Sequence, residues 1–105
     1  MTISALTSDK RLKTNIKAVK NPLDKISKIS GVSFEWKDGH DERIQNKTNL
    51  GVIAQEVQKV IPEVVKERDD GYLAVKYDQL VPVLIEAVKD QQKQIDVLKK
   101  KLEEL

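Results

Sequence analysis

The segment that decides the fold covers residues 81–105 and reads VPVLIEAVKDQQKQIDVLKKKLEEL. Its core positions recur at alternating spacings of three and four, which is the heptad pattern of a coiled-coil helix. These positions are Val81, Leu84, Val88, Gln91, Ile95, Leu98, Leu102 and Leu105. A helix with so narrow an apolar stripe is seldom stable alone, so the pattern predicts that copies of this chain associate.

These eight positions form the seam of the predicted coiled coil, and they leave the number of associating chains open. Ile95 followed by Leu98 favours a dimer, whereas Leu102 followed by Leu105 does not discriminate between oligomers. Gln91 would form a buried polar layer that fixes the register of the helices.

Upstream of this helix the chain is predicted to form short helices and short strands. Asn21 followed by Pro22 is a helix start, because asparagine caps helices and proline is tolerated at the first helical position. Gly31 is the expected C-terminal stop of that helix. Residues 32–37 alternate apolar and polar side chains, as in a half-buried strand, and Asp38-Gly39 is the turn signal that ends it.

A second apolar block follows the polar loop expected at residues 40–49. Residues 50–54 are predicted to pair as a buried strand, and residues 55–61 to form a helix that Pro62 ends. Residues 64–75 then form a predicted hairpin with Gly71 at its turn. The predicted fold class is therefore α+β, with short helices and small β-hairpins followed by a long C-terminal coiled-coil helix.

The composition limits what this chain can be. With 105 residues, 39% apolar and 34% charged, it forms one domain with a modest core that association would help to stabilise. The chain has no cysteine and one histidine, His40, so disulfides and thiolate–zinc sites are excluded and no metal or cofactor is predicted. No apolar run is long enough to span a membrane, and residues 1–7 are too short for a secretory signal, so we expect a soluble protein.

Positive charge is concentrated in the first third of the chain, although the net charge is only +2. The basic residues are Lys10, Arg11, Lys13, Lys17, Lys20, Lys25 and Lys28. A basic segment can bind nucleic acid, but no aromatic side chain is interleaved with these residues to stack on bases. A solvated face is the preferred interpretation, and nucleic-acid binding stays an alternative.

Ser8 and Lys13 supply the residue types for one kind of chemistry. A serine hydroxyl and a lysine amine can act as nucleophile and base without histidine or metal. A lysine near its reference pKa of about 10.4 is protonated and cannot accept the serine proton. Repulsion from Lys10 and Arg11, and burial when subunits assemble, would both disfavour the charged amine. Spacing alone leaves the alternative of a polar loop that opens a helix.

Three motifs occur in order along nearly the whole chain, namely SDKRLK at residues 8–13, GVIAQEV at residues 51–57 and YDQLVP at residues 77–82. In this order they resemble the intramolecular chaperone domain at the C-terminus of bacteriophage endosialidase tailspikes, tail fibres and neck appendages, the S74 peptidase family. A related domain occurs in the eukaryotic myelin regulatory factor. The resemblance implies a homotrimer that assists the folding of an N-terminal β-helical passenger of the same precursor, then releases itself by self-cleavage.

Carried over residue by residue, the resemblance makes Ser8 the nucleophile and Lys13 the general base of a single-turnover serine peptidase. The scissile bond would be Thr7–Ser8, attacked within one chain or between chains. Residues 1–7 would be a remnant of the passenger, residues 8–77 the chaperone and self-cleavage region, and residues 78–105 the coiled-coil helix. We expect assembly to switch on the cleavage.

Four further motif residues receive supporting roles, namely Asp9, Arg11, Gln55 and Glu56. For Gln55 and Glu56 the alternative is an ordinary helix start, where an early acidic residue favours the helix dipole. The chain as a whole also keeps an alternative, a non-catalytic coiled-coil oligomerisation module. The resemblance implies that the chaperone acts in the host cell cytoplasm during virion assembly and that the passenger ends in the virion tail or appendage.

Overall fold

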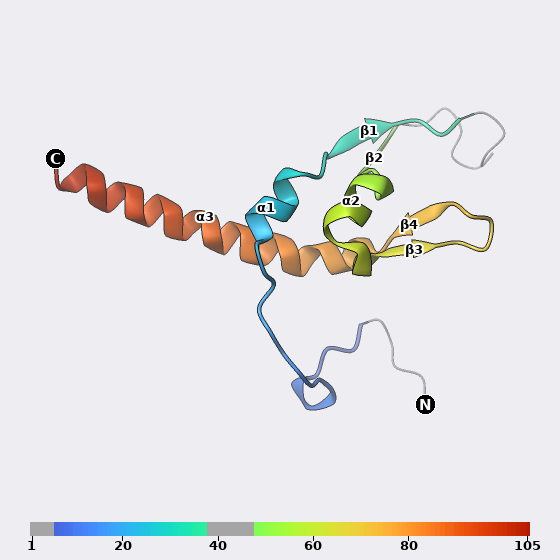
Figure 1. Cartoon of the computed structure of the whole chain (residues 1–105), viewed down its shortest axis with the longest axis horizontal. Coiled ribbons are helices and arrows are strands. Elements are labelled where there is room, and N and C mark those ends of the chain that lie inside the picture. The colour runs from blue at the N-terminus through green and yellow to red at the C-terminus, as the bar shows by residue number, and fades with distance from the viewer. Residues whose placement is uncertain (1–5, 38–47) are drawn as a thin grey trace.

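The structure is a computed structural model that describes residues 6–37 and 48–105. A small body of short helices and strands sits at one end of a long C-terminal helix, and an N-terminal arm hangs from the body (Figure 1). The α+β class with short helices, small strand pairs and a long terminal helix is therefore confirmed. The predicted turn at Asp38-Gly39 and the lone His40 lie outside the described residues.

Helix α1 spans Pro22–Ser27 and begins at the predicted proline. Asn21 precedes it in the left-handed conformation at φ 50°, and its side chain makes no capping hydrogen bond. The helix ends four residues before Gly31, so the prediction that Gly31 stops it is wrong. The backbone after α1 is held from outside the helix, because the Ser30 N–H donates to the Glu56 carboxylate at 2.9 Å.

The first strand pair joins β1 (Val32–Phe34) to β2 (Asn49–Gly51) in antiparallel register. Both strands are shorter than predicted. Trp36 lies beyond β1, where its ring meets Phe34 edge-on at 5.1 Å between centroids. The expectation of a buried strand at residues 50–54 is wrong, because one face of this two-stranded ribbon meets solvent and Leu50 is 84% exposed.

The glycine at the end of β2 is required by a close approach. A Cβ atom on Gly51 would lie 2.6 Å from Tyr77 Oη and 3.0 Å from Phe34 Cε1. Tyr77 opens a short 3-10 turn, Tyr77–Gln79, and its hydroxyl accepts a hydrogen bond from the Val52 N–H at 3.2 Å. This contact joins the middle and third motifs of the sequence.

The second half of the body follows the prediction closely. Helix α2 spans Ala54–Val60, and a 3-10 turn begins at Pro62. Strands β3 (Val65–Glu67) and β4 (Leu73–Val75) form the predicted hairpin. Gly71 adopts φ +88° at the turn, a conformation that glycine allows at no steric cost.

Helix α3 spans Leu80–Glu103 and carries two apolar faces. One face packs on the body, where the core forms between α2, the turn after it and the start of α3. The buried core residues are Val57, Ile61, Val64, Leu80 and Val83, with Val19, Ile26 and Ile29 among those partly buried against them. The packing that orders the body therefore uses only the first turns of α3.

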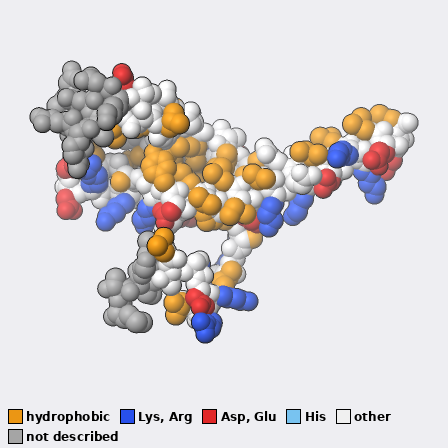
Figure 2. All heavy atoms as spheres, turned by 180° about the vertical axis from the view of Figure 1, so that it is seen from behind, with side chains coloured by type: hydrophobic (Ala, Val, Ile, Leu, Met, Phe, Trp, Pro, Cys, Tyr) orange, Lys and Arg blue, Asp and Glu red, His pale blue; other side chains and the backbone are white. Residues whose placement is uncertain are grey.

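The other face of α3 is the predicted seam, and it is exposed in the single chain. Its seven apolar members are between 47% and 98% exposed. In the space-filling view, hydrophobic side chains continue along α3 to its C-terminal end (Figure 2). The apolar surface needed for self-association is present, and the coiled coil itself stays a prediction.

Candidate active site

The motif serine and lysine lie on the N-terminal arm, residues 6–20. Every residue from Leu6 to Ala18 is exposed, and Val19 is the first that packs partly against the core. The arm extends away from the side of the body that carries β1 and β2 (Figure 1). The predicted scissile bond, Thr7–Ser8, therefore stands in an exposed stretch of chain.

A single 3-10 turn, Lys10–Leu12, folds the arm back on itself. Asp9 caps this turn, because its carboxylate accepts a hydrogen bond from the Arg11 N–H at 2.8 Å. The Lys13 N–H then donates to the Lys10 carbonyl at 3.1 Å and closes the turn. The turn thus reverses the direction of the chain and places residue 13 beside residue 8.

The turn brings the two motif side chains into contact. Lys13 Nζ donates a hydrogen bond to Ser8 Oγ at 2.7 Å, within the reach required of a base and its nucleophile. Both residues are exposed. For Lys13 to act as the base, the amine must first be neutral, and the proton must then pass from serine to lysine.

Asp9 and Arg11 form a two-pronged ion pair across the same turn. Arg11 Nε donates to Asp9 Oδ1 at 3.1 Å and a terminal guanidinium nitrogen donates to Oδ2 at 2.8 Å. The pKa of Asp9 is lowered, first by the side-chain hydrogen bonds from Arg11 and then by its backbone N–H. The pKa of Arg11 is raised by the same side-chain bonding. Exposed pairs add little stability, so we interpret this pair as a local bridge across the turn, and its supporting role stays a prediction.

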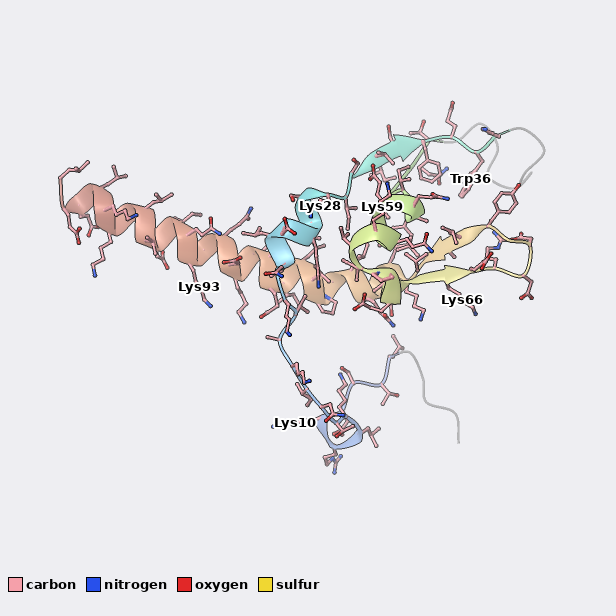
Figure 3. The ribbon with its side chains drawn as sticks, in the orientation of Figure 1. Lys10, Lys28, Trp36, Lys59, Lys66 and Lys93 are labelled. Atoms are coloured by element: carbon pink, nitrogen blue, oxygen red, sulfur yellow. The ribbon has the colours of Figure 1, made fainter. Side chains whose placement is uncertain are left out.

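The pairing changes one expectation about Lys13. Of the two neighbouring cations expected to disfavour its charge, Arg11 is compensated by the Asp9 carboxylate. Lys10 lies on the turn itself, away from the body (Figure 3). The repulsion expected from Arg11 is therefore reduced by its pairing with Asp9.

Gln55 and Glu56 lie in the first turn of α2, which the structure does not bring to Ser8 within one chain (Figure 1). The Glu56 carboxylate accepts hydrogen bonds from the Ser30 N–H at 2.9 Å and from Ser30 Oγ at 3.5 Å. It therefore ties the segment after α1 to α2, across 26 residues of sequence. Gln55 is exposed and lines an open groove between the two strand pairs.

Sequence reasoning missed that groove and the tyrosine beside it. The ribbon groove, as we call it, has an apolar lining that includes Trp36, Leu50, Ile53 and Tyr77. Trp36 projects into the space between the two ribbons in Figure 3. The signal was present in the Gly51 of the middle motif, since a glycine ending a strand often marks a close approach.

Metal sites require clusters of particular side chains, and membrane spans require long apolar helices. Within residues 6–37 and 48–105, no three histidine, cysteine or carboxylate side chains gather as metal ligands would. Over the same residues, none of the helices combines the length and hydrophobicity that crossing a membrane would take.

Comparison with known proteins supplies the context of this site. Residues 8–66 match the family model described as chaperone of endosialidase, Peptidase S74. The chain is 37% identical over 105 residues to the long tail fiber protein Gp37 of Salmonella phage S16, covering 95% of the chain and 14% of that protein. It is 38% identical over 104 residues to Gp37 of Enterobacteria phage K3, covering 92% of the chain and 8% of that protein.

A eukaryotic protein also matches. The chain is 28% identical over 112 residues to the myelin gene regulatory factor-like protein A of Dictyostelium discoideum, covering 90% of the chain and 12% of that protein. The chain therefore spans only 8% to 14% of the length of these three relatives.

Proposed function

This chain belongs to the chaperone of endosialidase family, Peptidase S74, and we propose that it is the intramolecular chaperone of a phage fibre or tailspike precursor. Residues 8–77 would form the chaperone and self-cleavage region, residues 78–105 the assembly helix, and residues 1–7 the remnant of the passenger. The passenger would be an N-terminal β-helical segment of the same precursor. The Gp37 names of two relatives, both tail fibre proteins, support this assignment.

Assembly into a homotrimer is the proposed basis of the chaperone activity. The support is the exposed seam on α3, which is separate from the face that packs on the body. Association through α3 would hold passenger chains close together, where their long-range pairing is otherwise slow to begin. We expect this step to take place in the host cytoplasm during virion assembly.

Self-cleavage at Thr7–Ser8 is the proposed final step, and the contact that carries it is the 2.7 Å hydrogen bond between Lys13 Nζ and Ser8 Oγ. Ser8 Oγ attacks the Thr7 carbonyl while neutral Lys13 takes the hydroxyl proton. Lys13 then returns that proton to the Ser8 nitrogen as the peptide bond breaks, which leaves Thr7 esterified to Ser8. Water hydrolyses the ester and frees the Thr7 carboxylate, so each chain reacts once.

Removal of the chaperone would leave the passenger with a barrier to unfolding but no means of refolding. Such a product is kinetically stable. A Ser8→Ala precursor is expected to assemble uncut, and its passenger to unfold and refold more reversibly than the matured form. Equal unfolding rates and equal reversibility for cut and uncut passengers would contradict the chaperone proposal.

A second candidate function is a coiled-coil oligomerisation module without catalysis. The observation in its favour is that Ser8 and Lys13 are both exposed in the single chain. The wild-type trimer separates the two functions, because only a self-cleaving chaperone would cut itself. Replacing Leu98 and Leu102 by glutamate tests in addition whether cleavage needs assembly. The proposal predicts a monomer that no longer cleaves. A monomer that cleaves at the full rate would overturn the coupling of cleavage to assembly, and a wild-type trimer that stays intact would favour the module.

A further inference from the structure

The basic arm and the ribbon groove each carry large apolar side chains that one chain leaves exposed. On the arm, Leu12 and Ile16 are each 63% exposed, and they stand on either side of Lys13 in the sequence. In the groove, Leu50 is 84% exposed and Tyr77 is 51% exposed. Contact between these side chains in an assembly would remove them from water.

Within one chain these two surfaces face away from each other. The arm is rooted by Val19 among Ile61, Val64 and Val83, at the start of α3. The groove lies between the two strand pairs, and β1 and β2 stand on the side of the body opposite the arm (Figure 1). An arm that keeps its root therefore points away from its own groove.

We propose that the arm of one copy docks into the ribbon groove of a neighbouring copy, with Leu12 and Ile16 as the side chains that enter it. This inference rests on the proposed function, because association through α3 is what places a second copy beside the arm. The root of the arm and the first seam residue, Val81, both lie at the body end of α3, so a neighbour aligned along the seam brings its body there.

Docking would complete the site in two ways. It would take Lys13 out of water together with Leu12 and Ile16, which favours the neutral amine that the reaction requires. It would also bring the Thr7–Ser8 bond near Gln55, an exposed amide that lines the groove and is distant from Ser8 in its own chain. The neighbouring copy would then supply part of the active site, and cleavage would depend on contact between chains.

Mixed assemblies of two variants test this inference directly. In Leu50→Ser the groove is impaired but Ser8 can still react, and in Ser8→Ala the groove is intact but no cleavage occurs. Leu50 is largely exposed, so its replacement leaves the fold in place, as circular dichroism would verify. We expect Leu50→Ser alone to cleave about tenfold or more slowly than wild type. Coexpressed in equal amounts with Ser8→Ala, about half of the Leu50→Ser chains should regain fast cleavage, because each chain has one neighbour on a given side of a ring.

An arm variant provides the matched opposite. Ile16→Ser should also cleave slowly, but Ser8→Ala partners should not rescue it, because the defect lies in the arm that must dock. Val97→Ser, a 53% exposed apolar position on α3 outside the groove, is the control and should cleave like wild type.

Three results would overturn the inference. Wild-type rates in Leu50→Ser and Ile16→Ser would show that neither surface takes part in cleavage. Slow cleavage of Leu50→Ser without rescue in mixed assemblies would show that the groove acts only within its own chain. Uncut wild-type chain would overturn the proposed self-cleavage and the inference with it. This failure is distinguished from failure of the docking alone, because it is seen in the wild-type chain without any variant.

Discussion

Replacing Gly51 by alanine tests how the body positions its motifs. The added Cβ would lie 2.6 Å from Tyr77 Oη and 3.0 Å from Phe34 Cε1, and both distances are shorter than an ordinary van der Waals contact. Tyr77 is half exposed and can swing outward, but it then loses the 3.2 Å hydrogen bond from the Val52 N–H. Overpacking together with a lost hydrogen bond predicts a decrease of about 1–3 kcal/mol in the free energy of unfolding.

A double-mutant cycle isolates the clash. Tyr77→Phe alone should cost about 0.5–1.5 kcal/mol, the value of one neutral hydrogen bond. It also removes Oη, after which the nearest ring atom of residue 77 is Cζ at 3.7 Å from the added Cβ. Gly51→Ala should therefore cost less in the Tyr77→Phe background than in its absence, with a coupling energy of about 1 kcal/mol.

The assay is urea denaturation followed by circular dichroism, with all variants in the uncut Ser8→Ala background. Protein concentration must be equal, because the stability of an associating chain depends on it. If the Gly51→Ala and Tyr77→Phe effects add to within about 0.3 kcal/mol, the two residues are not in the contact that the structure shows.

Three further predictions concern the core, the arm and the seam. Val57→Ala, at a fully buried position, should lower the free energy of unfolding by about 1–3 kcal/mol in the same urea assay. A decrease of less than about 0.5 kcal/mol would contradict the position of Val57 at the centre of the core. Because Arg11 holds the pKa of Asp9 below its usual range, their ion pair should be intact above about pH 4 and be lost as pH falls through the lowered pKa. Nuclear magnetic resonance of the Arg11 side-chain N–H should show this transition and Asp9→Asn should abolish it, whereas an unchanged spectrum would refute the pairing. Leu98→Glu should dissociate the assembly in analytical ultracentrifugation, while the control Val97→Glu should not.

The features that the sequence predicts well are those set by local rules. Gly71 marks the turn of the β3–β4 hairpin because its positive φ suits glycine, and Pro62 ends α2 because it lacks an amide hydrogen. The three–four spacing of residues 81–105 likewise leads to a single long helix with an exposed apolar seam. Ser8 and Lys13 come into contact because hydrogen bonds among the residues between and beside them close the turn that joins them.

The features that the sequence does not predict depend on contacts between distant segments. The helix α1 ends at Ser27 rather than near Gly31, and the following Ser30 is held by Glu56, 26 residues away. Tyr77 and Gly51, which approach each other closely, have the same separation in sequence, and neither residue alone indicates its partner. A motif can mark such residues as important, but only the fold shows whether they support the structure or the chemistry.

We propose that Ser8 and Lys13 cut the Thr7–Ser8 bond, and the intact mass of the purified 105-residue chain is the most direct test of this cleavage. We expect the wild-type chain to lose the mass of residues 1–7 after assembly, while Ser8→Ala and Lys13→Ala keep their full mass and still assemble. Wild-type chain that assembles and keeps its full mass would contradict the proposed cleavage, as would loss of the same seven residues from Ser8→Ala.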